Sequence, residues 1–347
     1  MFVAANRAVV KKAHRHLDRP LIPGFIHECM ANFQEHGSFP ACVVFIDLSG
    51  FTPLTETLMG QGASGVEALT NILNEVFEPL VALVYSRKGI IPYFAGDAFL
   101  GIFPHEPDID TSAVERLLQT ALAVRNYFEG RAYRFGHFTI GLKIGLACGP
   151  IEWGIVGRSQ KAFYFRGNAI DRCTDAQALA KDKAFSIVLD QSVQEQLPPG
   201  LQSAVLPLAP QFHYLPNDYR PASPVYPSAP VRPQERRIIE KFLPDAVLNY
   251  QEEGEFRTVT TVFISFTGIN THRLLNRFAG VVLELISNFS GYFKEIDYSD
   301  KGGVMVAFFG APVSFENNVD RALEFIYALG QDLIGLQRQY GLQYRVG

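Results

Sequence analysis

The sequence predicts an α+β protein built from two tandem copies of a ferredoxin-like domain, an antiparallel sheet with helices on one face, the second copy truncated. Three observations carry this prediction. Strand-like and helix-like segments follow the order β-α-(α)-β-β-α-β, a strand motif recurs in the second half, and prolines cluster between the halves. The chain has 347 residues, 48% of them apolar and 19% charged, which suffices for about two folded domains.

The first strand and the first long helix are predicted from apolar spacing. The run Val43–Leu48 is short, β-branched and almost entirely apolar, as in a strand buried on both faces. Downstream, Ser64 and Glu67 have the spacing of a capping box, so we expect a long helix to begin there. Its apolar residues recur every three or four positions and form one stripe: Val66, Leu69, Leu73, Val76, Leu80 and Val84.

A hairpin, a second helix and a further pair of strands complete the predicted domain. Two short apolar runs flank Ala95-Gly96-Asp97, which is a tight-turn sequence. Ser112 and Glu115 predict the start of the second helix. The segments FTIGLKIGLACG and IEWGIVG predict two separate strands after that helix.

Proline marks the boundary between the two predicted domains. Eleven of the 21 prolines lie between Pro198 and Pro244. Because proline fixes φ and removes a backbone donor, this stretch predicts an extended linker. We therefore divide the chain into a polar leader (1–37), a first domain (38–195), a proline-rich linker (196–254) and an incomplete second domain (255–347).

An internal repeat relates the two predicted domains. VVFIDLSG at Val43–Gly50 recurs as TVFISFTG at Thr261–Gly268, and LKIG at Leu142–Gly145 recurs as YRVG at Tyr344–Gly347. The repeat is too long for a solenoid, so it indicates two copies of one domain that pair with each other.

Asp47 and Asp97 are the leading candidate functional residues. An aspartate that leads out of a buried strand is unfavourable unless it is paired or bound to a metal. In a ferredoxin-like sheet the first strand and the hairpin are neighbours, so the two carboxylates can converge. Carboxylates without His or Cys favour Mg²⁺ or Mn²⁺ over zinc. Alternatively, Asp47 caps a helix and Asp97 is a turn residue, but the repeat favours a metal because it replaces them with Ser265 and Gly303.

The turn after the first strand is a candidate phosphate site. Gly50, Phe51 and Thr52 stand at an expected helix start, where backbone amides can bind phosphate oxygens. This turn directly follows Asp47, so a metal and a phosphate could lie side by side.

These motifs resemble those of the class III nucleotidyl cyclases. The segments that carry the resemblance are FIDLSGFT, FAGDAFL, KIGLACG and GIVG, and the likeness is greatest to the soluble, tandem-domain adenylyl cyclases of bacteria and animals. The resemblance implies that the two domains pair head to tail and convert ATP to cyclic AMP and pyrophosphate in the cleft between them. It also implies two Mg²⁺ or Mn²⁺ ions, held by Asp47, Asp97 and the carbonyl of Leu48.

The resemblance implies substrate contacts as well. Contacts with the phosphates are implied for Gly50, Phe51, Thr52 and Lys143, and Leu48 and Gly96 are also expected among the substrate-binding residues. Glu295 stands where adenylyl cyclases carry a base-reading lysine and guanylyl cyclases a glutamate, with Lys294 beside it. Because strand residues alternate faces, we expect only one of these two side chains to line the cleft. ATP is the expected substrate and GTP the alternative.

Two departures from the family pattern bear on activity and regulation. The family's second domain supplies an asparagine and an arginine for the ribose and the transition state. The first copy has Asp171 and Asp175 there, and the positions of the second copy lie beyond Gly347. We therefore expect little activity from the 347 residues alone, and the alternative function is a non-catalytic regulatory module that binds nucleotide or a partner. Bicarbonate-responsive members use a lysine and an arginine where this chain has Tyr93 and Thr174, which argues against that response.

Composition excludes several other classes. With 31 basic and 35 acidic residues the net charge is −4, so the chain has no basic field for nucleic acid. No apolar run approaches the roughly 18 residues of a membrane span, so we expect a cytoplasmic protein without membrane or nucleic-acid partners. Cys29, Cys42, Cys148 and Cys173 lack paired spacing and are interpreted as reduced, buried side chains.

Overall fold

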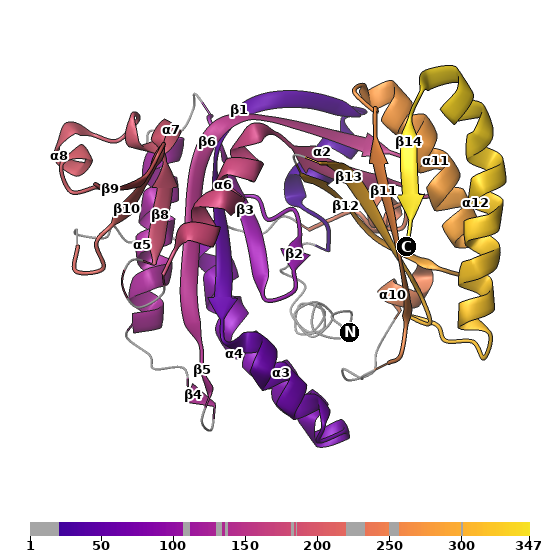
Figure 1. The fold of residues 1–347 in the computed structure, drawn as a ribbon, viewed down its shortest axis with the longest axis horizontal. Helices are drawn as coiled ribbons and strands as arrows, with labels where there is room; N and C mark the ends of the chain where they lie inside the picture. Colours follow the sequence, from indigo (N-terminus) through magenta and orange to yellow (C-terminus); the bar gives the residue numbers. More distant parts are fainter. Residues whose placement is uncertain are drawn as a thin grey trace.

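The chain folds around two β-sheets that lie side by side (Figure 1). The computed structural model describes residues 21–106, 112–129, 134–135, 138–181, 184, 186–219, 233–249, 257–299 and 301–347. The first sheet contains β1 (His36–Ser49), β2 (Phe94–Ala95), β3 (Ala98–Pro104), β6 (Gly141–Val156), β7 (Ala162–Arg166), β8 (Ile187–Asp190), β9 (Leu206–Ala209) and β10 (Phe212–Leu215). The second contains β11 (Thr260–Thr267), β12 (Tyr292–Ser299), β13 (Gly302–Phe309) and β14 (Gln343–Val346). A separate hairpin pairs β4 (Arg134–Phe135) with β5 (Phe138–Thr139).

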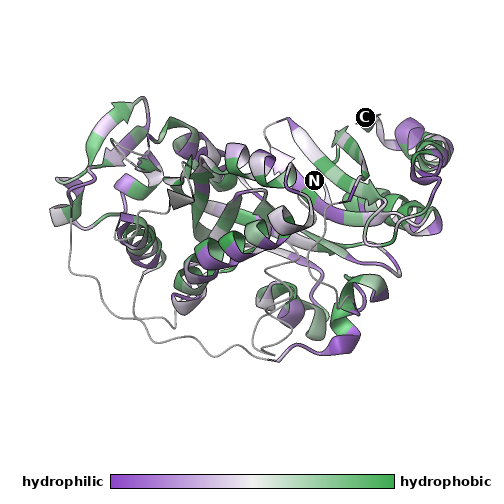
Figure 2. Ribbon diagram, turned by 90° about the horizontal axis from the view of Figure 1, so that it is seen from below, coloured by the Kyte–Doolittle hydropathy of each residue, from purple (hydrophilic) through white to green (hydrophobic). Residues whose placement is uncertain are grey.

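The helices pack on these sheets or connect their strands. In the first part of the chain they are α2 (Gly24–Ala31), α3 (Phe51–Met59), α4 (Ala63–Ser86), α5 (Ala113–Glu129), α6 (Asn168–Leu179), α7 (Gln191–Gln194) and α8 (Pro199–Gln202). Later in the chain they are α9 (Arg236–Ile239), α10 (Asp245–Leu248), α11 (His272–Asn288) and α12 (Asn318–Tyr340). In Figure 2 the longer helices carry both hydrophobic and hydrophilic residues, as expected of helices with one buried side. Among the described residues, none of the helices combines the length and apolarity that a membrane span requires.

The first sheet is mixed and carries helices on both faces, so two parts of the predicted architecture are wrong. Its strand order is β2-β3-β1-β6-β8-β10-β9, with β7 also paired to β6, and β6 runs parallel to β8. Val44 and Ile46 of β1 pack in the core beneath α4 and α5. Val43, on the other face, packs in a core that includes Ile170 of α6. Helices cover both faces because successive side chains of β1 are apolar on both sides.

The helix patterns are largely confirmed. All six residues of the predicted stripe on α4 are buried. α5 begins as predicted, with the Glu115 N–H donating to Ser112 Oγ at 3.3 Å. The predicted capping box on α4 is wrong, because Gly62 is the N-cap residue and the Ser64 hydroxyl donates to the carbonyl of Gln61 instead.

The two strands predicted after α5 are one continuous strand, β6, of 16 residues. The proline within it, Pro150, lies opposite Pro40 of β1. Two residues away the facing pair Cys42 and Cys148 has a Cα–Cα distance of 4.1 Å, which is typical of a non-hydrogen-bonded pair. Hydrogen-bonded and non-hydrogen-bonded pairs alternate along antiparallel strands, so the pair Pro40–Pro150 is also a non-hydrogen-bonded pair. Neither proline has to donate to the other strand, and the pairing of β1 with β6 continues past them.

The same register overturns the prediction for two of the cysteines. Cys42 and Cys148 form a disulfide between β1 and β6, although 106 residues separate them in the sequence. The spacing of cysteines along the sequence cannot predict this disulfide, because the two cysteines meet only through the register of β1 against β6. Cys29 and Cys173 are free and buried, as expected.

Part of the predicted linker belongs to the first sheet. β9 and β10 lie within residues 196–254, and β10 pairs with β8, so this part is not an extended connection. Residues 220–232 and 250–254 of the predicted linker, residues 255–256 of the predicted second domain and residues 1–20 of the predicted leader lie outside the described residues. The remainder of the leader contains α2, whose Ile26 is fully buried in the core with Val43.

The second sheet has the strand order β12-β13-β11-β14 and is covered on one face by α11 and α12. Its hydrophobic core also contains Val156, Ala162 and Tyr164, which come from the β6–β7 hairpin of the first sheet. Figure 1 shows β1 and β6 extending from the first sheet toward the second. The β6–β7 hairpin therefore fixes the position of one sheet relative to the other.

Candidate active site

Asp47 lies near the end of β1, between two neighbouring strands. It pairs in register with Ala98 of β3 and with Lys143 of β6. Its neighbours Ile46 and Leu48 are buried in the core, whereas Asp47 is partly exposed. The β1 strand thus places the Asp47 carboxylate at the edge of the hydrophobic core.

Asp97 occupies the turn between β2 and β3. Gly96 has φ +68°, a left-handed conformation that glycine adopts without strain and that closes this turn. The N–H of Leu48 donates to the carbonyl of Asp97 at 3.2 Å, which ties the turn to the end of β1. The structure therefore brings together Asp47, Leu48, Gly96 and Asp97.

Burial disfavours the charged form of both carboxylates. Burial raises the pKa of Asp47, and the negative charge of Asp97 raises it further. Lys143 and the N–H of Leu48 act in the opposite direction and lower the pKa of Asp47. Burial also raises the pKa of Asp97, while a backbone hydrogen bond lowers it. Two half-buried carboxylates with one cationic neighbour form a site that a further cation would stabilise.

Gln177 also contacts this site, and the sequence analysis did not identify it. Its side-chain Nε2 donates to Oδ2 of Asp47 at 2.7 Å. Gln177 lies on α6, which packs against β6 and β1. The 130 residues between Gln177 and Asp47 leave no local pattern from which the contact could be predicted.

The turn after β1 has the expected local structure. Gly50 has φ +82° and is the N-cap residue of α3, with no side chain capping the helix. A Cβ at Gly50 would lie 2.6 Å from the carbonyl oxygen of Thr139, so no other residue fits without a shift of backbone. The side chain of Phe51 is buried in the core and that of Thr52 is exposed. Any phosphate contact of Phe51 would thus involve its backbone, not its ring.

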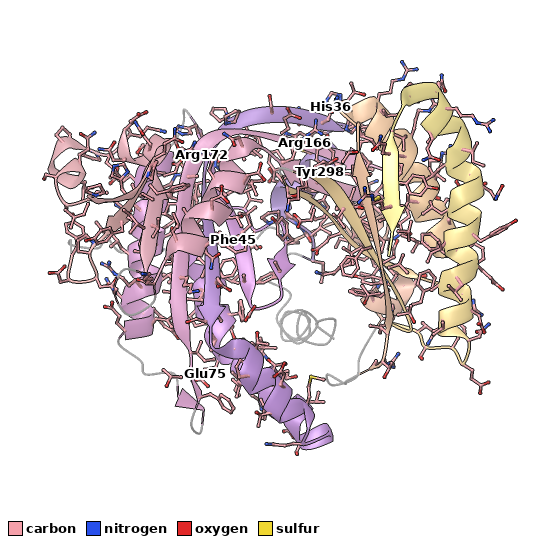
Figure 3. All side chains as sticks on the ribbon, viewed as in Figure 1. His36, Phe45, Glu75, Arg166, Arg172 and Tyr298 are labelled. Atoms are coloured by element: carbon pink, nitrogen blue, oxygen red, sulfur yellow. A yellow bond between two sulfur atoms is a disulfide. The ribbon has the colours of Figure 1, made fainter. Side chains whose placement is uncertain are left out.

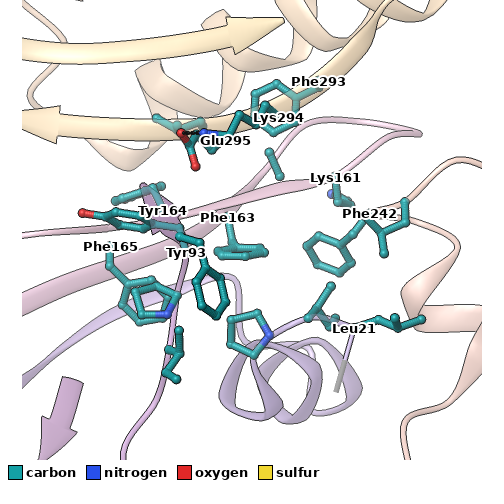
Figure 4. A pocket seen from close by; sticks show the side chains of 18 of the residues that line it. Leu21, Tyr93, Lys161, Phe163, Tyr164, Phe165, Phe242, Phe293, Lys294 and Glu295 are labelled. Carbon is teal, nitrogen blue, oxygen red and sulfur yellow. Dashed lines mark hydrogen bonds and ion pairs between the residues drawn. The ribbon is translucent and has the colours of Figure 1, made fainter. Parts of the chain in front are cut away.

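Glu295 and Lys294 lie together on β12, contrary to the expectation that only one of them faces the cleft. The register between β12 and β13 shifts between Phe293 and Glu295, so Lys294 is the extra residue of a β-bulge. The Lys294 Nζ and Glu295 Oε1 atoms form an ion pair of 2.5 Å (Figure 4). The bulge interrupts the alternation of side chains, so both line the same cavity.

This cavity has a volume of about 260 Å³ and lies between the two sheets. Figure 4 shows Tyr93, Phe163 and Phe165 of the first sheet region facing Lys294 and Glu295. Asp47 and Asp97 do not line it, so the carboxylates and the cavity are separate parts of the junction.

Four further side chains that the sequence analysis compared with the cyclase family are Tyr93, Thr174, Asp171 and Asp175. Tyr93 is half-buried in the cavity wall, and burial together with the charges of Asp297 and Glu295 raises its pKa. Thr174 donates to the carbonyl of Ile170 within α6. Asp171 lies in the first turn of the same helix, and Asp175 is exposed. None of these four side chains carries the positive charge that binds an anion.

The family model described as "Adenylate and Guanylate cyclase catalytic domain" matches residues 33–203, which contain Asp47, Asp97, Lys143 and Gln177. This segment belongs to the class III cyclase family. Over 149 residues the chain is 32% identical to adenylate cyclase type 10 of Rattus norvegicus, and the same identity is found for the Homo sapiens protein. These alignments cover 41% of this chain and 9% of the relatives, so the chain spans a small part of their length.

Solved cyclase structures are also similar to the chain. The adenylyl cyclase CyaB from P. aeruginosa has a TM-score of 0.43 at 18% identity, over 54% of this chain and 97% of that one. The guanylate cyclase domain of RhGC from Catenaria anguillulae, solved in complex with GTP, has a TM-score of 0.41 at 17% identity. That alignment covers 51% of this chain and 97% of the Catenaria domain.

The residues of the cyclase domain fit a divalent cation. Class III cyclases use divalent metal ions. Asp47 and Asp97 offer hard oxygen ligands, and their mutual repulsion is relieved when a cation binds. Among the described residues no group of three or more His, Cys, Asp or Glu side chains could hold a metal, so a cation here depends on further oxygen ligands. The carbonyl of Leu48 and the oxygens of a phosphorylated ligand are the candidates.

Proposed function

We propose that the protein is a class III cyclase that converts ATP to cyclic AMP and pyrophosphate. The observation that carries the proposal is the convergence of Asp47 and Asp97 at one edge of the first sheet, with the pKa of each carboxylate raised. Membership of residues 33–203 in the cyclase family supports it.

In this proposal Asp47, Asp97 and the carbonyl of Leu48 hold two Mg²⁺ or Mn²⁺ ions. When bound, such ions activate the ribose 3′-hydroxyl and neutralise charge on the triphosphate. Lys143, opposite Asp47 in the register, would pair with the triphosphate. The backbone of the turn that begins at Gly50 would bind phosphate oxygens, because amides at a helix start are free to donate.

We also propose that the second sheet is a second cyclase homology domain that pairs with the first. Its order β12-β13-β11-β14 corresponds to the order β2-β3-β1-β6 in the first sheet. Ser265 pairs with Val304 and Arg345 just as Asp47 pairs with Ala98 and Lys143. The second domain would then lack metal ligands and contribute the base-reading residues of β12.

The test is product formation by the protein at its full encoded length, with Mn²⁺ and either ATP or GTP, followed by mass spectrometry. We expect cyclic AMP and pyrophosphate in equal amounts. The alternative is a non-catalytic module: a pair of two first domains would place Asp171 and Asp175 where the family has an asparagine and an arginine, and these acids cannot stabilise a developing negative charge. Binding of nucleotide without any cyclic product would establish that alternative.

A further inference from the structure

We infer that Gln177 is a positioning residue, which holds the Asp47 carboxylate in the orientation that binds a divalent cation. This inference rests on the metal site of the proposed function. Gln177 Nε2 donates to Asp47 Oδ2 at 2.7 Å, a short and therefore well-formed contact. A carboxylate oxygen that accepts one hydrogen bond keeps another lone pair, so the contact restrains the side chain without preventing coordination.

The fold holds Gln177 at this position through an unusually close helix–strand approach. A Cβ at Gly145 of β6 would lie 2.0 Å from the carbonyl oxygen of Cys173 and 2.5 Å from the backbone nitrogen of Gln177. Only glycine therefore permits α6 to pack here. The Cys173 thiol, one turn before Gln177, donates to the carbonyls of Val43 and Gly145 at 3.3 and 3.1 Å.

These contacts attach α6 to both strands that carry the site. Val43 lies four residues before Asp47 on β1, and Gly145 lies two residues after Lys143 on β6. Gln177 is consequently fixed relative to Asp47 by backbone contacts on either side. A side chain placed in this way can orient its partner with little loss of conformational entropy on binding.

The chemical nature of Gln177 also suits this role. Asp47 already has one cationic neighbour, Lys143, and one anionic neighbour, Asp97. A second cation in place of Gln177 would repel an incoming metal, and a glutamate would add a third negative charge. The neutral amide donates a hydrogen bond without changing the net charge of the site.

The experiment measures Mn²⁺ binding to the 347-residue chain by electron paramagnetic resonance of the free ion, without nucleotide. We expect Gln177→Met to weaken Mn²⁺ affinity about tenfold or more, since loss of a hydrogen bond to a metal ligand typically has this effect. Gln191→Met is the matched control, because Gln191 Nε2 also donates to a carboxylate, Glu195, at 2.7 Å but outside the site. We expect it to bind Mn²⁺ as the unchanged chain does.

Asp47→Asn separates failure of this inference from failure of the metal site. If Asp47→Asn loses Mn²⁺ and Gln177→Met binds it normally, the positioning role is wrong and the metal site stands. If Asp47→Asn binds Mn²⁺ normally, the metal site is wrong and the positioning role falls with it. Should Gln177→Met not fold, Gln177→Asn replaces it, because the shorter amide cannot reach Asp47. Normal affinity in Gln177→Asn would overturn the inference in the same way.

Discussion

At the residue scale, Asp47 is placed where it opposes folding. Its pKa is raised by burial and by Asp97, so the folded state keeps the proton to a higher pH than the unfolded state, whose value is near 3.8. Between 3.8 and the raised value the folded state binds more protons. The contribution of Asp47 to stability therefore falls as the pH rises through this window, and at neutral pH the ionised side chain destabilises the metal-free protein.

We therefore predict that Asp47→Asn stabilises the metal-free chain at pH 7, by about 1 kcal/mol or less because the group is partly screened by solvent. The measurement is urea unfolding in the presence of a chelator. Asp175→Asn, on the exposed side of α6, is the control and is expected to change little. A lower free energy of unfolding for Asp47→Asn would contradict this account of the site.

The base-reading position gives a second residue-scale prediction. Lys294 Nζ pairs with Glu295 Oε1 and retains two further donors, one of which can serve adenine N1 in the proposed function. We predict that ATP outcompetes GTP at full encoded length, and that Lys294→Met shifts the preference toward GTP by at least about tenfold. Glu295→Lys should keep the preference for ATP. If the unchanged protein prefers GTP and Glu295→Lys shifts the preference to ATP, the prediction is wrong and Glu295 recognises guanine.

Sequence could predict residues of the site that belong to a local motif, and not those that depend on register or tertiary packing. Asp47 and Asp97 stand in recognisable strand and turn segments, and their loss from the repeat made them the leading candidates for function. Gln177 approaches Asp47 only because α6 packs on Gly145. The shared orientation of Lys294 and Glu295 depends on a bulge, which the strand pattern does not reveal.

At the scale of elements, the β6–β7 hairpin and the start of α11 make the contact between the sheets. His36 of β1 stacks on His272 of α11 with ring centroids 4.3 Å apart, and the Tyr164 hydroxyl lies 3.4 Å from His272 Nδ1. Figure 3 shows His36, Arg166 and Tyr298 in this part of the junction. Burial lowers the pKa of His272, as do His36, Arg166 and Lys161, whereas Glu35 raises it.

We predict that acid destabilises this contact. The pKa of folded His272 lies below its ordinary value of 6.5, so the unfolded state takes up the proton first. The contribution of His272 to stability is therefore lost as the pH falls below about 6.5. Urea midpoints at pH 7.5 and 5.5 should differ less in His272→Gln than in the unchanged chain, with His213→Gln on β10 as control. If the urea midpoint falls between pH 7.5 and 5.5 by the same amount in His272→Gln as in the unchanged chain, the prediction is wrong.

Sequence patterns at this scale identified each strand of the repeat but misjudged how strands continue and which strands join the sheet. β6 continues through Pro150 because Pro150 and the facing Pro40 form a non-hydrogen-bonded pair, in which neither residue has to donate to the other strand. β9 and β10 are short and lie among prolines, so their apolar pattern is too brief to distinguish them from a linker. Their place in the sheet follows from pairing with β8, which is a long-range contact.

At the scale of the whole molecule, the proposed metal ligands Asp47 and Asp97 lie in the first sheet, whereas the proposed base-reading residues Lys294 and Glu295 lie on β12 of the second. Catalysis in this proposal therefore depends on both sheets and on the β6–β7 hairpin, which packs into the core of the second sheet.

The central claim is that Asp47 and Asp97 together bind the cations on which catalysis depends. The most direct test is the rate of cyclic nucleotide formation, with ATP and Mn²⁺, by Asp47→Ala and Asp97→Ala at full encoded length, with circular dichroism to confirm folding. The account predicts that each folded variant loses all measurable activity, because each lacks a ligand that the other aspartate cannot replace. Near-normal turnover in either variant would contradict it.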